Sequence, residues 1–291
     1  MDIRIARRAL RDVVSVCRTT SPSTATRWLV SLMMRLPECA GSRSLSPADR
    51  TWARSGASFH TATGAVVSLP AAYTSGAREM YCRKVYLRSG LTMPSAGWVI
   101  DLGANQGLFA VWAALSGAKV VAVEVQHGFA EEIERLAAHN GVDARIYVEV
   151  AMASGVTVSG ATVGIVADDH RWSATSHGAL TRPADVSIPE LVSKYQIDRV
   201  RLLKVDIEGG EFAVFADGDL RWLEQVDQLA VELHRDYGDA TSLVEKLRRH
   251  GFTIDLQDND GNRVAATSPR LEYAYCTRIG TQRKSLQARL H

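Results

Sequence analysis

From Trp98 onward the chain alternates between short apolar runs and segments in which apolar residues recur every three or four positions. The short runs are typical of buried strands, and the periodic segments are typical of amphipathic helices. Strands that alternate with helices indicate a doubly wound, mostly parallel α/β sheet, and the last two strands, joined by a turn, predict an antiparallel C-terminal edge strand. The expected strands cover residues 98–102, 119–125, 144–150, 200–205, 228–233, 252–256 and 272–279, and the expected helices cover residues 106–116, 128–140, 188–195 and 240–250, with a short helix from Glu211. The polar segment 167–183 is expected to be a long loop, of a length typical of a lid.

The first 75 residues have a different pattern, which predicts a helical N-terminal extension. Residues 1–18 fit an amphipathic helix with an apolar stripe and an arginine-bearing face, a second helix covers 24–36, and residues 41–47 are expected to be a loop. We expect the stripe to pack against the main domain or a second subunit of a homodimer, so that the extension serves packing, oligomerisation or capping of the substrate. A different interpretation is peripheral contact of residues 1–36 with an anionic membrane. The stripe consists of Ile3, Ala6, Leu10, Val13, Val14 and Cys17, and the arginines are Arg4, Arg7, Arg8, Arg11 and Arg18.

Charge and composition narrow the class of protein. The 291 residues include 34 Lys and Arg against 32 Asp and Glu, and this balance argues against a strong nucleic-acid binder, which needs a dense positive field. Residues 1–58 contain ten Arg, no Lys and four acids, a local charge of +6 that leaves −4 for the rest. No apolar run approaches the roughly 18–20 residues of a membrane helix, and arginines interrupt any signal-peptide pattern. With four scattered cysteines and no C-x-x-C pair, we expect a cytoplasmic protein with reduced thiols.

The most informative motif is a strand that runs into a glycine turn. Gly103 and Gly107 follow the strand at 98–102, and Glu124 ends the next strand, where an acid can accept hydrogen bonds from ribose hydroxyls. The spacing does not match G-x-G-x-x-G, which argues against a nicotinamide oxidoreductase, and no phosphate-loop lysine is present. Asp101 instead precedes the first glycine, and a carboxylate there suits a cationic nucleotide ligand such as S-adenosylmethionine.

These segments resemble the signature of the FkbM family of S-adenosylmethionine-dependent methyltransferases. The resemblance covers roughly residues 76–280 and follows the family's order. One departure is Glu124-Val-Gln126, where family members often have Glu-Pro-Asn. The segments that carry it are Arg78-Glu-Met-Tyr-Cys-Arg-Lys-Val-Tyr86, Asp101-Leu-Gly-Ala-Asn-Gln-Gly107, Glu124, Leu203-Lys-Val-Asp-Ile-Glu-Gly-Gly-Glu211 and Ala230-Val-Glu-Leu-His234.

The resemblance implies a class I methyltransferase domain over residues 76–280, after the extension of residues 1–75 and before a tail of residues 281–291. It implies O-methyl transfer to a hydroxyl of a small molecule, sugar or glycolipid, as in secondary metabolite biosynthesis. It also places an adenine contact at Glu149. The alternative is a methyltransferase-fold protein without catalysis that serves as a binding or scaffold module, including at a membrane surface. The residues expected to bind S-adenosylmethionine are Asp101, Gly103, Asn105, Gly107, Glu124, Glu149 and Asp206.

Groups that assist methyl transfer are expected at the carboxyl ends of strands, where ligands of α/β sheets bind. The protein must align the acceptor, exclude water and remove the acceptor's proton. We predict Asp206, Glu208 and His234 as catalytic residues, with His234 as a general base because an unperturbed imidazole has a pKa of about 6.5. Asp206 has a second interpretation, holding the methionine ammonium. A divalent metal held by clustered acids is a less favoured alternative, and no metal ligands are assigned.

Overall fold

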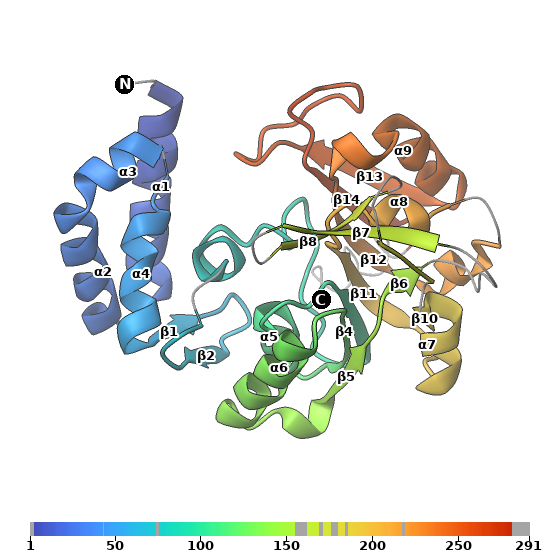
Figure 1. The fold of residues 1–291 in the computed structure, drawn as a ribbon, viewed down its shortest axis with the longest axis horizontal. Helices are drawn as coiled ribbons and strands as arrows, with labels where there is room; N and C mark the ends of the chain where they lie inside the picture. The colour runs from blue at the N-terminus through green and yellow to red at the C-terminus, as the bar shows by residue number, and fades with distance from the viewer. Residues whose placement is uncertain are drawn as a thin grey trace, which may run out of the picture.

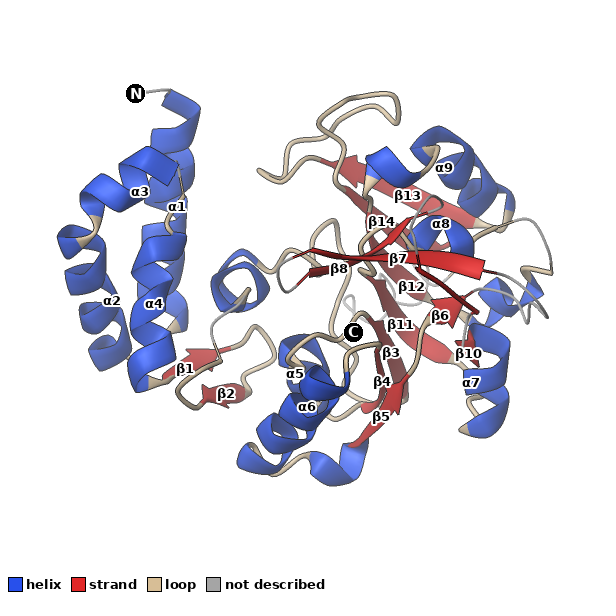
Figure 2. Cartoon of the chain, viewed as in Figure 1, coloured by secondary structure: helices blue, strands red, loops and turns tan. Residues whose placement is uncertain are grey.

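The computed structural model describes residues 3–42, 44–73, 76–154, 162–168, 171–175, 180–183, 186–216 and 219–280. An N-terminal group of helices stands beside a larger α/β unit (Figures 1 and 2). The first part contains α1 (Ile3–Thr19), α2 (Pro22–Met34), α3 (Leu36–Ser42), α4 (Ser46–Ser55), the hairpin β1 (Ala57–His60) and β2 (Val66–Leu69), and the π-helix η1 (Arg78–Arg83). The tail predicted at residues 281–291 lies outside the described residues.

The α/β unit is built on a seven-stranded sheet in the order β13-β14-β12-β11-β3-β4-β5. All of its pairings are parallel except those of β14, which runs antiparallel to both β12 and β13. The antiparallel C-terminal strand expected at the edge is therefore present, one position in from the edge strand β13. The strands are β3 (Trp98–Leu102), β4 (Lys119–Glu124), β5 (Ile146–Val150), β11 (Val200–Val205), β12 (Gln228–Glu232), β13 (Phe252–Gln257) and β14 (Tyr273–Arg278).

Helices cover both faces of this sheet because its strands are apolar on both sides. Alternate residues of one strand belong to different cores: Val99 packs into one, with Phe109 of α5, and Ile100 packs into the other, with Val244 of α9. This two-sided burial confirms the doubly wound fold. The covering helices are α5 (Leu108–Leu115), α6 (His127–His139), α7 (Ile188–Lys194), α8 (Glu211–Val214) and α9 (Ala240–Arg249), with the short 3₁₀ turns η2 (Asp143–Arg145), η3 (Arg221–Gln225) and η4 (Arg235–Tyr237).

The polar segment 167–183 is not a simple loop. Its described residues include β8 (Arg171–Thr175) and β9 (Leu180–Pro183), which pair with β7 (Thr162–Asp168) in a small antiparallel sheet. The separate short pair β6 (Ala153–Ser154) and β10 (Val186–Ser187) lies at the base of this excursion. The expected loop at residues 41–47 is also replaced in part, since α3 extends to Ser42 and α4 begins at Ser46.

The N-terminal helices share a core with the α/β unit. Ring contacts run without a break from Trp28 through Trp52, Phe59 and Tyr81 to Trp112 of α5, with ring centroids 4.9–6.2 Å apart. Large aromatic rings supply much of a core's buried apolar area. The hydrophobic core is therefore continuous across the boundary predicted near residue 75.

The apolar stripe of α1 does not face inward as a whole. Leu10 is 65% exposed and Val14 is 41% exposed, whereas Asp12 and Val16 are buried. The expectation that the stripe packs on the main domain is wrong for Leu10 and Val14, because polar contacts orient this helix: Asp12 forms a buried ion pair with Arg78 of η1.

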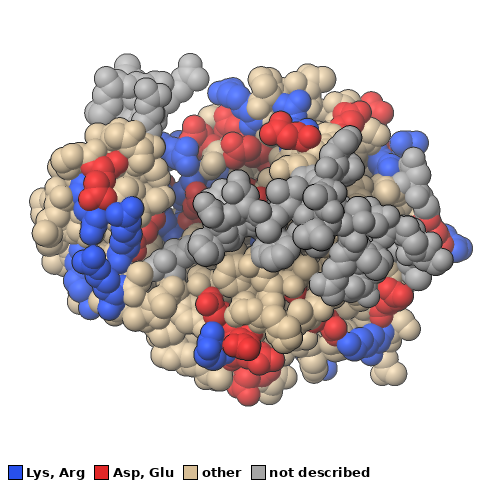
Figure 3. Space-filling model, in the orientation of Figure 1, with Lys and Arg blue, Asp and Glu red and all other residues tan. Residues whose placement is uncertain are grey.

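In the view of Figure 3, a group of basic side chains lies on the surface of the N-terminal helices, beside acidic ones. On α1, Arg8 lies 3.5 Å from the Asp260 carboxylate, and Arg11 donates to the Asp260 carbonyl at 3.2 Å. These arginines hold the turn between β13 and β14. None of the described helices has the length and apolar composition needed to cross a membrane.

Candidate active site

A cavity of about 650 Å³ lies at the carboxyl ends of β3, β4, β11 and β12. The strand order reverses between β3 and β11, and open α/β sheets bind their ligands at such a switch point. The walls come from the turn after β3, the ends of the other three strands, and η1 with the segment that follows it. The volume falls in the range of about 300–1,000 Å³ that small-molecule sites occupy.

The turn after β3 needs glycine for reasons of chain packing. Gly103 has φ +74°, and a Cβ there would lie 1.7 Å from the backbone oxygen of Asp206, at the end of the neighbouring strand. Gly107 has φ +82° and begins α5, where a Cβ would press on Ile133 at 3.1 Å. Gly103 and Asn105 line the cavity, whereas Gly107 does not and acts by letting the helix approach α6.

Glu124 is fastened by backbone amides of two loops. One carboxylate oxygen accepts from the Asn105 N–H and the other from the Gln126 N–H, each at 2.9 Å. Burial raises the pKa of Glu124, and the two amide hydrogen bonds oppose that rise. The carboxylate lines the cavity with lone pairs to spare, because each oxygen can accept more than one hydrogen bond.

Asp101 does not reach the cavity. It is completely buried, and its carboxylate accepts from the Lys204 ammonium at 2.9 Å. Lys204 also donates to the Gly103 carbonyl at 3.0 Å and does line the cavity. The expectation that the Asp101 carboxylate faces a cationic ligand is therefore wrong, because Lys204 takes up its charge and ties it to the glycine turn.

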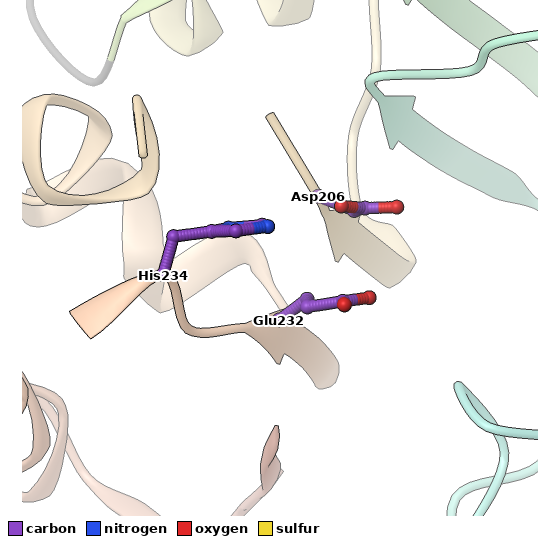
Figure 4. Close-up of side chains that lie close together, drawn as sticks. All are labelled: Asp206, Glu232 and His234. Atoms are coloured by element: carbon purple, nitrogen blue, oxygen red, sulfur yellow. The ribbon is translucent and has the colours of Figure 1, made fainter. Parts of the chain in front are cut away.

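Tyr86 connects two carboxylates at the opposite end of the cavity from Glu124 along the sheet. Its hydroxyl lies 2.6 Å from Asp206 and 2.7 Å from Glu232. A phenol has one proton to donate, so it satisfies one carboxylate and leaves the other in need of a proton or cation. Burial, followed by the charge of Asp206, raises the pKa of Glu232 to about 8. Figure 4 shows Asp206, Glu232 and His234 extending side by side from neighbouring strand ends.

His234 is held between two acids. Its Nδ1 lies 3.1 Å from the buried Glu211 carboxylate, and its Nε2 lies 3.3 Å from Glu208, which is half exposed. Burial by itself lowers the pKa of His234, but the hydrogen bond and charge of Glu211, with the charges of Asp206 and Glu232, raise it to about 9. In this arrangement the imidazole keeps its proton at neutral pH, which removes the reason for predicting it as a general base. Glu208 and Asp206 line the cavity with it, as expected.

Glu149, like Asp101 and Gly107, is a predicted cofactor residue that does not line the cavity. Its carboxylate binds Tyr195 and lies 2.5 Å from the Lys194 ammonium, both at the end of α7. The backbone that follows β5 supplies the wall instead, through Ala151, Met152 and Ala153. The strand end was correctly placed, but alternation along β5 sends the Glu149 side chain to the α7 side.

The sequence indicated neither the contacts of Tyr86 nor the ion pair of Lys204. Tyr86 ends the segment before the glycine turn and contacts both strand-end acids, and no motif identified it as a contact across 120 residues of chain. Lys204 alternates with Asp206 along β11, and that spacing indicated a shared face without indicating its ion pair with Asp101.

Comparison with known proteins gives a family. The methyltransferase FkbM domain matches residues 101–254, more than half of the chain. The 31-O-demethyl-FK506 methyltransferase FkbM of Streptomyces tacrolimicus is 26% identical over 210 residues, which cover 61% of this chain and 80% of that protein. The AMB antimetabolite synthetase AmbE of Pseudomonas aeruginosa is 27% identical over 230 residues, 62% of this chain, and the match spans only 11% of that synthetase.

The solved structures that match are remote in sequence. TrmK of M. capricolum, in complex with S-adenosyl-homocysteine, has 8% identity and a TM-score of 0.40, over 68% of this chain and 67% of that one. A putative rRNA methylase from Clostridium thermocellum has 10% identity and a TM-score of 0.39, over 63% of this chain and 87% of that one. On the domain match over more than half its length, the chain belongs to the FkbM family of S-adenosylmethionine-dependent methyltransferases.

Proposed function

We propose that this protein is an O-methyltransferase that moves a methyl group from S-adenosylmethionine to a hydroxyl of a small-molecule, sugar or glycolipid acceptor. The observation that carries the proposal is one cavity whose lining joins Glu124, an acid held by backbone amides, to the acid-rich group Asp206, Glu208 and Glu232. The relative from Streptomyces tacrolimicus is named for a 31-O-methylation, which supports oxygen as the acceptor atom.

The residues present fit S-adenosylmethionine. Glu124 would accept hydrogen bonds from the ribose hydroxyls, the backbone of Gly103 and Asn105 would border the methionine part, and Phe129 and Met152 offer apolar wall for the adenine. Carboxylates around the cavity suit a ligand that carries an ammonium and a sulfonium. When bound, S-adenosylmethionine supplies a methyl group on a positively charged sulfur, so the leaving group is neutral.

The acceptor hydroxyl would lie against Asp206 and Glu232. Its oxygen must lose a proton as it is methylated, and Asp206 would take that proton, because the raised pKa of Glu232 keeps Glu232 protonated at neutral pH. Tyr86 and Lys204 fix Asp206 in place, with the hydroxyl at 2.6 Å and the ammonium at 3.7 Å. His234, held as a cation by Glu211 and Glu208, would orient the acceptor rather than deprotonate it.

A thermal-shift titration with S-adenosylhomocysteine tests the cofactor assignment. Ligand at about 100 times its dissociation constant should add about 2.7 kcal/mol to the free energy of unfolding. Release of S-adenosylhomocysteine from a panel of glycosides, polyketides and lipid-linked sugars then tests the reaction. No shift at millimolar ligand would contradict the proposal, whereas a shift without turnover on any hydroxyl acceptor would favour the scaffold alternative.

The role of Asp206 can be separated from cofactor binding. Asp206→Asn should keep the S-adenosylhomocysteine shift and lower turnover by roughly 10² or more, because it removes a group that takes the acceptor's proton. Asp219→Asn, the same change at an exposed acid paired with Arg221, is the matched control and should leave both unchanged. Equal rates for the two variants would remove Asp206 from the reaction.

A further inference from the structure

We propose that Asp206, Glu232 and His234 form a binding site for a divalent cation of the Mn²⁺ type at the acceptor end of the cavity. Each of the three side chains offers a ligand atom, and these atoms lie within 4.8 Å of one another. They extend in the same direction from the ends of two neighbouring strands, β11 and β12 (Figure 4). Ligands of an ion at about 2.1 Å lie about 3 Å apart when adjacent, so small side-chain rotations would close the site.

The orientation of His234 is that of a metal ligand. Glu211 is completely buried and accepts from the His234 backbone N–H at 2.6 Å, and the same oxygen lies 3.1 Å from Nδ1. An imidazole that binds a metal usually donates its other N–H to a carboxylate in this way. With Nδ1 so engaged, Nε2 is the atom left for the ion, and binding the ion releases the proton that Nε2 carries in the ion-free protein. Glu208, 3.3 Å from Nε2 on a half-exposed side chain, could rotate to add a further oxygen.

The charges around the cluster favour a cation. Asp206 and Glu232 share the single hydroxyl proton of Tyr86, which cannot satisfy both. The nearest ammonium, Lys204, lies 2.9 Å from Asp101 but 3.7 Å from Asp206, so its charge is largely committed elsewhere. A divalent ion would displace the protons that Glu232 and His234 hold without it, and would take over the balancing of the carboxylate charge.

The donor set favours a first-row transition-metal ion over Mg²⁺. Two carboxylates with one imidazole suit Mn²⁺, which accepts both oxygen and nitrogen ligands, better than Mg²⁺, which favours oxygen alone. This inference rests on the proposed function for its role: the ion would bind the acceptor hydroxyl and ease loss of its proton. Binding of the ion itself does not depend on methyl transfer.

The test measures Mn²⁺ directly on the full chain, after EDTA treatment and without a metal-binding tag. The loss of the electron paramagnetic resonance signal of free Mn²⁺ should give one bound ion per chain, with a dissociation constant below about 100 μM. Glu232→Gln and His234→Gln should each weaken binding at least tenfold. Glu79→Gln makes the same charge change on another wall of the cavity and should stay within twofold of the unmodified protein.

The S-adenosylhomocysteine thermal shift of each variant shows that the fold and the cofactor end remain intact. No bound Mn²⁺ at 1 mM, or equal weakening by Glu79→Gln and Glu232→Gln, would overturn the proposal. Full turnover of the EDTA-treated enzyme with no bound ion would overturn the metal site while leaving the proposed function standing. Bound Mn²⁺ with no turnover on any acceptor would support the metal site and contradict the proposed function.

Discussion

The Glu124 carboxylate accepts hydrogen bonds from the backbone amides of two loops that border the cavity, one with each of its oxygens. Glu124→Gln replaces one oxygen with an NH₂ group that opposes a backbone N–H, and a buried donor without an acceptor costs about 1–3 kcal/mol. We expect S-adenosylhomocysteine to bind at least tenfold more weakly, because the same carboxylate is the proposed ribose acceptor. Isothermal titration checks this. Glu149→Gln is the matched control, an acid on the adjacent strand outside the cavity, and should bind normally. Equal affinities in the two variants would remove Glu124 from the cofactor site.

Site residues that follow directly from the strand pattern were predictable. A strand end fixes where the backbone stops, so Glu124, Asp206 and His234 were correctly expected on one edge of the sheet. The direction and charge state of a side chain depend on partners distant in sequence. Glu149 is turned aside by α7, and the pKa of His234 is set mainly by Glu211 against the effect of burial.

At the scale of elements, the close approach of the ends of β3 and β11 requires a glycine, which has no Cβ, at position 103. Gly103→Ala would put a methyl group 1.7 Å from the Asp206 carbonyl oxygen, so the strand ends would have to separate. We expect a loss of more than about 4 kcal/mol in the free energy of unfolding, or no soluble protein. Gly141→Ala has a similar φ, +67°, in open space and should cost only about 1–2 kcal/mol. Urea denaturation of both variants is the measurement, and similar costs would show that φ rather than the contact matters.

The junction of α1, α4 and η1 is ionic and should respond to pH. The Arg78 guanidinium is shared by the Asp12 and Asp49 carboxylates, and burial, against the opposing charge of Arg78, raises the pKa of Asp49 to about 6 from 3.8. As pH rises from 4 to 6, the unfolded chain therefore releases this proton before the folded chain does. The free energy of unfolding should fall over that window, by up to about 3 kcal/mol. Other ionisable groups around this junction are the thiols of Cys39 and Cys82 and the charged side chains of Glu38, Glu79 and Arg83.

Asp49→Asn cannot release a proton, so it should remove that part of the pH dependence. The expected result is a flatter profile of unfolding free energy between pH 4 and pH 6 than that of the unmodified protein, measured in parallel by urea denaturation. The absolute stability of the variant does not enter the comparison, because only the slopes are compared. Parallel profiles would mean that Asp49 is not the group responsible.

Elements with strong local patterns were predicted well, and those that depend on pairing were not. The strand expected at residues 98–102 is β3 without change, and α9 differs from its expected range by one residue. The polar segment 167–183 carries no apolar alternation, so pairing of β8 and β9 with β7 could not be inferred from it. Likewise, the order of the elements along the chain does not indicate that β14 pairs between β12 and β13 in the sheet.

At the scale of the whole molecule, the N-terminal extension supports one wall of the cavity. The segment from Gly76 to Tyr86 lines the cavity, and the extension holds it through the Arg78 ion pairs and the ring contacts of Trp52, Phe59 and Tyr81. Two arginines of the extension thus form contacts within the chain, since Arg8 and Arg11 bind the β13–β14 turn.

Deleting residues 1–55 should therefore damage the cofactor site. Removal of α1 to α4 takes away both carboxylates that hold Arg78 and strips the Trp52 ring from Phe59, and loss of a large buried ring costs about 3–5 kcal/mol. At about 2–4 °C per kcal/mol, the melting temperature should fall by about 6–20 °C, with loss of the S-adenosylhomocysteine shift. The full-length variant R78M/D12N/D49N replaces the ion network with uncharged groups and keeps the rings, so it should retain most of that shift. If the truncated protein bound S-adenosylhomocysteine normally, the extension would be a separate unit. If the triple variant lost binding as completely as the truncation, the ion pairs rather than the aromatic core would hold η1 in place.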